Sequence, residues 1–155
     1  MKIGFKKVHP DAKIPTYAHP GDAGMDVYAV EDVSLALYRP TLVQTGLVAD
    51  IPDGYEIQVR PRSGLALKGV TVVNGPGTVD SSYRGPIGVI LMFVNNVYVD
   101  SPDGTRVVRK SQFEIHKGDR IAQLVLAPVT RCEPVEIAEV SDTERGAGGF
   151  GSTGR

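Results

Sequence analysis

Turn-forming residues break this sequence into short segments and leave no stretch with the sustained period of an amphipathic helix. The 155 residues include 18 Gly and 11 Pro, and the segments between them alternate apolar and polar side chains or form short apolar runs. Such segments are typical of strands. Many short strands separated by turns predict an all-β fold, which we expect to be a jelly-roll-like β-sandwich or barrel within one domain.

The strongest strand signal is the segment YEIQVR at residues 55–60, which alternates strictly and follows a Pro-Asp-Gly turn. A long surface hairpin is predicted around the Ser-Pro-Asp-Gly sequence at residues 101–104. A further strand is expected after the Lys-Gly-Asp turn at 117–119. The remaining predicted strands are residues 3–8, 26–30, 33–37, 42–49, 87–91, 112–116 and 135–140.

Charge and cysteine content narrow the class of protein. With 17 basic and 18 acidic residues the net charge is about -1, which lacks the excess of Lys and Arg typical of nucleic-acid binding. The single cysteine, Cys132, excludes an internal disulfide framework and fits a reducing compartment. The N-terminus has no apolar leader and no apolar run is long enough to span a membrane. We therefore expect a soluble, cytoplasmic protein.

The segment 74–91, NGPGTVDSSYRGPIGVIL, organises the rest of the sequence. Its Gly and Pro residues, its turn-prone Asp80-Ser81-Ser82 and the apolar run that follows predict a β-hairpin with polar groups at its mouth. Asp80 has two interpretations from this segment alone. It initiates a turn with Tyr83 packed beside it, or it supplies a chemically active carboxylate.

Two further segments carry groups suited to binding anions and cations. In PRSGLALKG, Arg62 offers a planar fork of donors, Ser63 a hydroxyl and Gly64 an unobstructed backbone N–H, and residues 65–68 are compatible with one helical turn. These are the components of a phosphate cradle, although many loops contain them. Asp26 caps a turn or presents a hard oxygen ligand to a divalent cation or its water shell.

The C-terminal arm, residues 145–155, is too rich in glycine to bury apolar surface by itself. Its glycines match a dinucleotide fingerprint and nearly match a P-loop, but too little chain follows them to form the helix that either motif needs. The arm is therefore a disordered tail or a lid that closes over a nucleotide with an arginine, an aromatic ring and hydroxyls. We predict a division into a body of residues 1–144 and this arm.

Five segments, in this order, resemble the trimeric deoxyuridine triphosphatases (dUTPases). They are AGMDVYA (23–29), PRSGLA (61–66), GTVDSSYRG (77–85), GDRIAQL (118–124) and RGAGGFGST (145–153). Each segment alone is weakly specific, whereas the ordered set is highly specific and covers nearly the whole chain. Two departures from the family are Pro86, where many relatives carry a polar or acidic residue, and a longer hairpin at residues 95–111. Both are expected to lie away from the matched positions.

The resemblance implies a jelly-roll homotrimer that uses Mg²⁺ to hydrolyse dUTP to dUMP and pyrophosphate, with three sites at subunit boundaries. It assigns Asp80 to activation of the attacking water, Tyr83 to the deoxyribose, and Asn74 with the neighbouring backbone to uracil. Asp26 engages the magnesium shell through water. The implied binding residues are Arg62, Ser63, Gly64, Asn74, Gly77, Thr78, Val79, Tyr83 and Gln123 in the body and, in the arm of another subunit, Arg145, Phe150, Gly151, Ser152 and Thr153.

The residues agree with this chemistry. Triphosphate hydrolysis needs charge neutralisation, alignment and one base, which Arg forks, backbone N–H groups, Mg²⁺ and a single carboxylate provide. The three histidines have no metal-ligand spacing, so we interpret them and Cys132 as structural. Arg120 is compatible with phosphate binding, but an ion pair with an acidic residue is favoured.

Two other classes of protein remain possible from the sequence. The dCTP deaminases share the fold and a PRSG-like loop, but they place a glutamate on the strand after the central hairpin, where this chain reads GVILMFV. The second class is a regulator that senses dUTP without hydrolysing it. Retention of Asp80 argues against that class, and the extended hairpin is the expected location for a partner.

Overall fold

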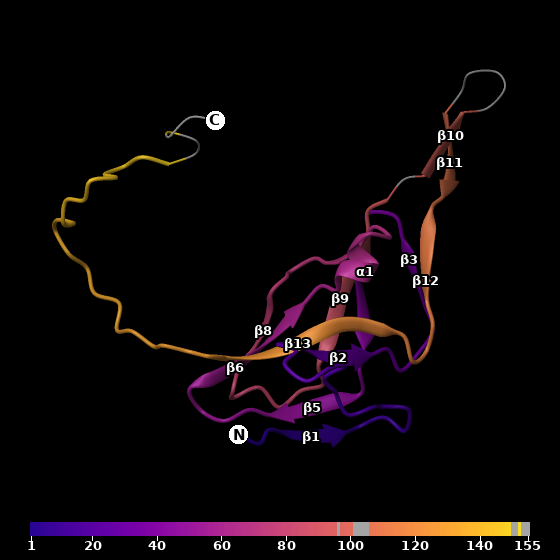
Figure 1. The fold of residues 1–155 in the computed structure, drawn as a ribbon, viewed down its shortest axis with the longest axis horizontal. Helices are drawn as coiled ribbons and strands as arrows, with labels where there is room; N and C mark the ends of the chain where they lie inside the picture. Colours follow the sequence, from indigo (N-terminus) through magenta and orange to yellow (C-terminus); the bar gives the residue numbers. More distant parts are fainter. Residues whose placement is uncertain (96, 101–105, 150–151, 153–155) are drawn as a thin grey trace.

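The computed structural model describes residues 1–95, 97–100, 106–149 and 152, and the fold is almost entirely built of strands (Figure 1). In chain order the elements are β1 (Gly4–Lys7), β2 (Met25–Tyr28), β3 (Val33–Ala36), β4 (Thr41–Gln44), β5 (Leu47–Asp50), β6 (Tyr55–Arg60), α1 (Ser63–Ala66), β7 (Val70–Val72), β8 (Gly77–Val79), β9 (Gly88–Phe93), β10 (Val97–Asp100), β11 (Arg106–Lys110), β12 (Gln112–Ile115) and β13 (Arg120–Pro128). The predicted all-β class is confirmed.

The described strands form antiparallel sheets with many non-sequential neighbours. A four-stranded sheet has the order β2-β13-β6-β8, and a three-stranded sheet has the order β4-β9-β7. Three two-stranded sheets pair β1 with β5, β3 with β12, and β10 with β11. This crossing of strands between sheets agrees with the predicted jelly-roll-like sandwich.

One apolar core joins the two larger sheets. Strand β9 buries alternate residues, Val89, Leu91 and Phe93, and β6 buries Ile57 and Val59. Side chains from β2, β4, β5 and β13 belong to the same buried cluster. Because alternate residues of a strand point to opposite faces, the polar residues Glu56, Gln58 and Arg60 of β6 point away from this core. Among the described residues, no helix has the length and apolar character to cross a membrane.

The predicted hairpin over residues 74–91 is wrong in its pairing. Strand β8 pairs with β6, with Val79 opposite Ile57, whereas β9 lies between β4 and β7 in the other sheet. The segment between β8 and β9 therefore crosses from one sheet to the other. Both edges of β9 are already hydrogen-bonded to other strands, so β8 has no place beside it.

The predicted strand 42–49 is divided into β4 and β5 by Thr45 and Gly46. Gly46 has a φ of 65°, a left-handed conformation that ends the ladder and that glycine adopts without strain. The buried Thr45 hydroxyl donates to the Ile87 carbonyl at 2.6 Å. The predicted helical turn at 65–68 is present but begins two residues earlier, as α1 at Ser63.

The predicted strand at residues 135–140 is also wrong. Val135, Ile137 and Val140 are 70%, 61% and 81% exposed, and residues 129–149 contain no strand. After β13 this part of the chain leaves the sheets and runs through the orange and yellow part of Figure 1. A strand needs a neighbour for its backbone N–H and C=O groups, and the described part of this chain offers none there.

The long surface hairpin predicted around residues 101–104 has its two strands in the described part of the chain. The antiparallel pairing of β10 with β11, over residues 97–100 and 106–110, confirms it. The Ser-Pro-Asp-Gly tip at 101–104 lies outside the described residues. The base of the hairpin follows Val94, whose N–H donates to the Gly69 carbonyl at 2.7 Å.

We predict that Gly46→Ala destabilises the body by more than about 2 kcal/mol, because it adds both backbone strain and overpacking. A Cβ at Gly46 would lie 2.5 Å from the His9 Cβ and 3.0 Å from the Ala12 Cβ. Gly54 has a φ of 80° with no heavy atom within 4 Å of its Cβ position, so Gly54→Ala isolates the backbone strain of about 1 kcal/mol. Urea unfolding of both variants measures the difference, and equal effects would contradict the packing argument.

Candidate functional site

An open cavity of about 260 Å³ lies where β8 and the turn after it face β4 and β9. Five of the predicted site residues line it, and they are Asn74, Thr78, Val79, Asp80 and Tyr83. The other lining residues are Leu42, Gln44, Pro86, Ile87, Gly88 and Ile90. Most of the polar lining residues therefore come from the short segment 74–83, with Gln44 added from β4, and the other lining residues are mainly apolar.

The turn after β8 is held by its own hydrogen bonds. The Tyr83 N–H donates to the Asp80 carbonyl at 3.1 Å, and the Tyr83 hydroxyl donates to the Pro86 carbonyl at 3.1 Å. The Asp80 carboxylate remains exposed at the cavity. A carboxylate in this position can accept a proton from water, and an aromatic ring beside it can limit the shape of a bound molecule.

Pairing with β6 fixes the other wall of the cavity. Thr78 lies opposite Gln58 and Gly77 opposite Val59 in the ladder. A Cβ at Gly77 would lie 2.9 Å from the Asn74 Nδ2, so the glycine leaves space for the Asn74 amide. An amide carries both donors and an acceptor, which suits it to reading the edge of a heterocyclic base.

Sequence reasoning missed part of the cavity lining. Leu42, Gln44 and Ile90 come from β4 and β9 and reach the cavity through non-local strand pairing, so no local motif marks them. Pro86 was expected to lie away from the matched positions, and this was wrong. It lines the cavity and its carbonyl accepts the Tyr83 hydroxyl, because the chain turns back there before entering β9.

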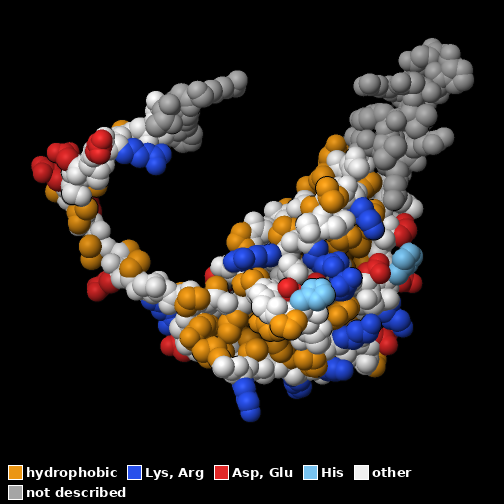
Figure 2. Space-filling model, in the orientation of Figure 1, with side chains coloured by type: hydrophobic (Ala, Val, Ile, Leu, Met, Phe, Trp, Pro, Cys, Tyr) orange, Lys and Arg blue, Asp and Glu red, His pale blue; other side chains and the backbone are white. Residues whose placement is uncertain are grey.

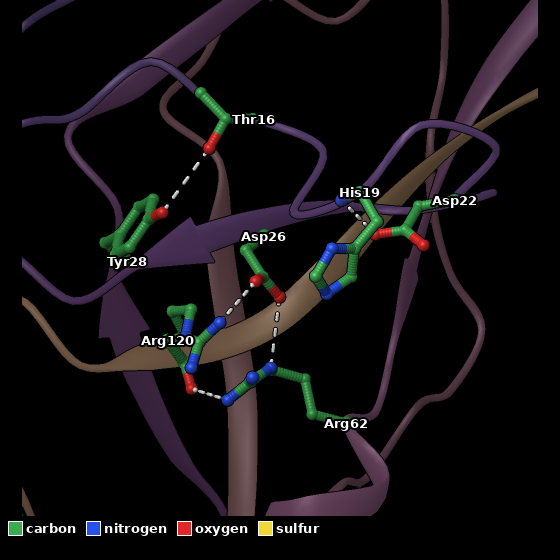
Figure 3. A network of polar contacts seen from close by, with 7 residues as sticks. All are labelled: Thr16, His19, Asp22, Asp26, Tyr28, Arg62 and Arg120. Atoms are coloured by element: carbon green, nitrogen blue, oxygen red, sulfur yellow. Dashed lines mark hydrogen bonds and ion pairs between the residues drawn. The ribbon is translucent and has the colours of Figure 1, made fainter.

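A second group of predicted residues surrounds the buried Asp26 carboxylate (Figure 3). The Arg62 Nε donates to Asp26 Oδ1 and the Arg120 Nη1 donates to Asp26 Oδ2, both at 3.1 Å. Arg62 also donates through Nη1 to the Arg120 carbonyl at 3.0 Å. We call these three residues the Asp26 network. The predicted ion pair between Arg120 and an acidic residue is confirmed.

The Asp26 network leaves cationic surface available. The side chains of Arg62 and Arg120 are 23% and 50% exposed, whereas that of Asp26 is 6% exposed. On the face seen in Figure 2, Lys and Arg side chains gather over α1, β2 and β13. A buried carboxylate that orients two guanidinium groups and leaves their other N–H donors at the surface can prepare them for an anion.

The remaining predicted phosphate residues lie close to the Asp26 network in the fold. Ser63 and Gly64 begin α1 directly after Arg62, and no heavy atom lies within 4 Å of a Cβ position at Gly64. Gln123 lies opposite Asp26 in the pairing of β13 with β2. It packs closely on Gly24, where a Cβ would lie 3.0 Å from the Gln123 Cβ.

Strand register separates the cavity from the Asp26 network within one chain. Asp80 follows Val79, which lies opposite Ile57, whereas Arg62 follows the other end of β6. Arg62 is five residues beyond Ile57 (62 minus 57), which corresponds to roughly 16 Å of extended chain. Neither Arg62 nor Arg120 lines the cavity. Within one chain, Asp80 and the Asp26 network therefore do not reach the same small chemical group of a ligand.

The described arm residues lie apart from both groups (Figure 1). Arg145 folds back on the arm, and its Nε donates to the Gly148 carbonyl at 2.8 Å. The Ser152 N–H donates to the Gly149 carbonyl at 3.1 Å. The predicted residues Phe150, Gly151 and Thr153 lie outside the described residues.

The histidines and the cysteine form no metal cage in the described part of the chain. No group of three or more His, Cys, Asp or Glu side chains there is arranged to hold a metal ion. The Nδ1 of His116 lies 3.8 Å from Asp32, and both side chains are largely exposed. Cys132 is exposed and free.

The comparisons with known proteins all indicate the same protein family. The sequence model described as dUTPase matches residues 10–109 and 105–154. The chain is 48% identical to the deoxyuridine 5'-triphosphate nucleotidohydrolase of Picosynechococcus sp. over 99% of each protein. It is 49% identical to that of Nautilia profundicola over 100% of each. The solved structure of Staphylococcus bacteriophage 80alpha dUTPase with dUPNHPP superimposes with a TM-score of 0.83 at 29% identity, covering 99% of each chain.

We predict that Asp26→Asn lowers the free energy of unfolding by about 1–3 kcal/mol, because the neutral amide cannot pair with both guanidinium groups. Asp53→Asn is the matched control. Asp53 pairs with Arg131 at 2.9 Å, but the two side chains are 82% and 70% exposed. Such a surface pair contributes little, so its loss should change stability by less than about 0.5 kcal/mol. Urea denaturation compares the two, and a similar small effect in both would remove the structural role of Asp26.

Proposed function

The chain belongs to the dUTPase family and hydrolyses dUTP to dUMP and pyrophosphate, and from this premise we propose that Asp80 is its general base. The observation that carries the proposal is the cavity in which the Asp80 carboxylate lies beside Asn74 and Tyr83. The reaction needs a water molecule, a base to accept its proton, and an α-phosphorus held in line with that water.

In the proposed mechanism Asp80 takes the proton of the water that attacks the α-phosphorus. The new bond joins the water oxygen to that phosphorus, and the bond to the bridging oxygen of pyrophosphate breaks. The electron pair of that bond leaves with pyrophosphate, and dUMP retains the α-phosphate. The carboxylate of Asp80 is exposed and ready to accept the proton, whereas that of Asp26 already accepts two guanidinium donors.

Base and sugar are read by different groups of the same cavity. Uracil presents a donor at N3 and an acceptor at O4, and cytosine reverses this pattern. The Asn74 amide and the backbone of Gly77, Thr78 and Val79 can match uracil and leave unpaired polar groups with cytosine. The Tyr83 ring lies against the deoxyribose and leaves no space for a 2′-hydroxyl.

The triphosphate is bound by the residues around the Asp26 network. Arg62 supplies further guanidinium N–H donors, α1 begins with the Ser63 hydroxyl and the open backbone of Gly64, and Gln123 supplies an amide. A fixed set of donors stabilises the charge that develops on the phosphoryl oxygens without reorganisation during the reaction. Asp26 contributes by fixing the orientation of Arg62.

The residues present fit Mg²⁺, which the family resemblance implies. Magnesium keeps several waters and is bound through one or two carboxylates together with substrate phosphates, so no all-protein cage is required. Each Asp26 oxygen accepts one guanidinium donor and retains a second lone pair for a water. Asp26, through water, and the phosphates would hold the ion, which when bound neutralises charge on the triphosphate.

In a homotrimer, the cavity of one copy can meet the Asp26 network of another copy, although the two lie apart within one chain. We assign each complete site to the cavity of one copy, the Asp26 network of a neighbour and the arm of a third or neighbouring copy. The separation along β6 supports this assignment, and the exposed apolar side chains of Val135, Ile137 and Val140 are compatible with a contact between copies. The arm, residues 145–155, would add Arg145, Ser152 and Thr153 to the phosphates and place Phe150 over the base, with Gly151 between them. The body is then residues 1–144.

Asp80→Asn should lower turnover of dUTP by roughly 10²- to 10⁴-fold with nearly unchanged dUTP binding, because the amide keeps the shape but cannot accept the proton. Asp11→Asn is the control, since Asp11 pairs with Lys117 and does not line the cavity. Pyrophosphate release at saturating dUTP and Mg²⁺ measures turnover. Unchanged turnover in Asp80→Asn would remove Asp80 from the mechanism.

Mixed oligomers test whether arms cross between copies. A chain ending at Glu144 and full-length Asp80→Asn should each be nearly inactive, for different reasons. After the two are unfolded together in equal amounts and refolded, roughly a quarter of the sites should pair an intact Asp80 with an intact arm, because assembly is random. Activity in the mixture, absent from either parent, is the expected result. An inactive mixture with heterotrimers shown by native mass spectrometry would mean that each arm serves its own chain.

A further inference from the structure

Gly85 lies under the ring of Tyr83, at the end of the turn that carries Asp80. A Cβ at Gly85 would lie 2.5 Å from the Tyr83 Cζ and 2.9 Å from its Cε2, and it would overlap the hydroxyl as well. Apart from the two chain neighbours of Gly85, the three heavy atoms nearest to that position all belong to Tyr83. A side chain at Gly85 and the observed position of the Tyr83 ring therefore exclude each other.

The backbone itself does not require glycine at this position. Gly85 does not have the positive φ that marks Gly46 and Gly54. An alanine can adopt such a backbone without strain. The absence of a side chain at Gly85 therefore serves the Tyr83 ring rather than the turn.

The backbone of the turn has several polar contacts, so we expect the Tyr83 ring to move before the backbone does when a side chain is added. The Arg84 Nη1 donates to the Ser81 carbonyl at 2.7 Å and to the Tyr83 carbonyl at 3.1 Å. The Arg84 Nη2 lies 3.2 Å from Asp50 Oδ1 on β5. Tyr83 is half exposed, and within the described part of the chain its hydroxyl makes one hydrogen bond, to the Pro86 carbonyl, so the ring can rotate outward.

We propose that Gly85 is a specificity-determining residue that acts through Tyr83, by leaving the space in which the ring closes the sugar side of the cavity. This inference rests on the proposed role of Tyr83 in excluding a 2′-hydroxyl. Gly85 touches neither substrate nor reacting atoms in this account, so it is a positioning residue. Displacing the ring should admit ribonucleotides while Asp80 and the uracil-reading groups keep their places.

The test measures kcat/KM for dUTP and UTP in Gly85→Ala, Tyr83→Ala, the double variant and Tyr83→Phe. We expect Gly85→Ala and Tyr83→Ala each to reduce the preference for dUTP over UTP at least about tenfold. Because both act through one ring, the double variant should show no further reduction beyond Tyr83→Ala. Tyr83→Phe keeps the ring and should retain the preference within a few-fold.

The possible results distinguish a failure of the inference about Gly85 from a failure of the proposed role of Tyr83. If Tyr83→Ala loses the preference and a folded Gly85→Ala keeps it, the role of Gly85 is refuted and that of Tyr83 stands. If Tyr83→Ala keeps the preference, both are refuted. If Gly85→Ala fails to fold, normal folding of the double variant shows that the clash is with the Tyr83 ring, whereas failure of both shows a backbone requirement and overturns the inference.

Discussion

The structure depends on the antiparallel pairing of β6 with β13 on one side and with β8 on the other. The ladder with β8 places Val79 opposite Ile57 and so delivers Asp80 to one end of β6, while the chain leaves the other end into Arg62. The ladder with β13 places Gln123 opposite Arg60. One strand thus positions the segment of the proposed general base and the proposed anion-binding segment, with a fixed separation that side-chain rotation cannot close.

The Asp26 network shows how this fold prepares a cationic surface in advance. A buried carboxylate is unfavourable by itself, and its cost is offset by two guanidinium donors whose long side chains would otherwise be free to move. The rotamer freedom of Arg62 is therefore lost on folding rather than on binding. In the proposed reaction this means that the phosphate donors need little rearrangement. By the same contact, we expect Asp26 to contribute to stability as well as to the proposed reaction.

Much of the fold could be predicted from local pattern because β6, β9 and the long hairpin carry their own periodicity and turns. The incorrect predictions concern which strands pair with one another, and a local sequence pattern does not encode strand pairing. Residues 135–140 contain Val and Ile, which favour strands, but have no neighbouring strand in the described chain. The segment 74–91 has the turn residues of a hairpin although its two strands belong to different sheets. For the same reason Leu42, Gln44 and Ile90 could not be assigned to the cavity. Asp80, Asn74 and Tyr83 could be, because the single segment 74–91 contains all three.

The central claim is that the cavity of one copy and the Asp26 network of another act on the same nucleotide. The most direct measurement is an experimental structure of the full-length protein with a non-hydrolysable dUTP analogue and Mg²⁺. We predict that one analogue contacts Asn74 and Tyr83 of one copy, with Asp80 facing its α-phosphorus, while its phosphates contact Arg62 and Ser63 of a second copy. A nucleotide whose base and phosphates are both bound by the same copy would contradict the account.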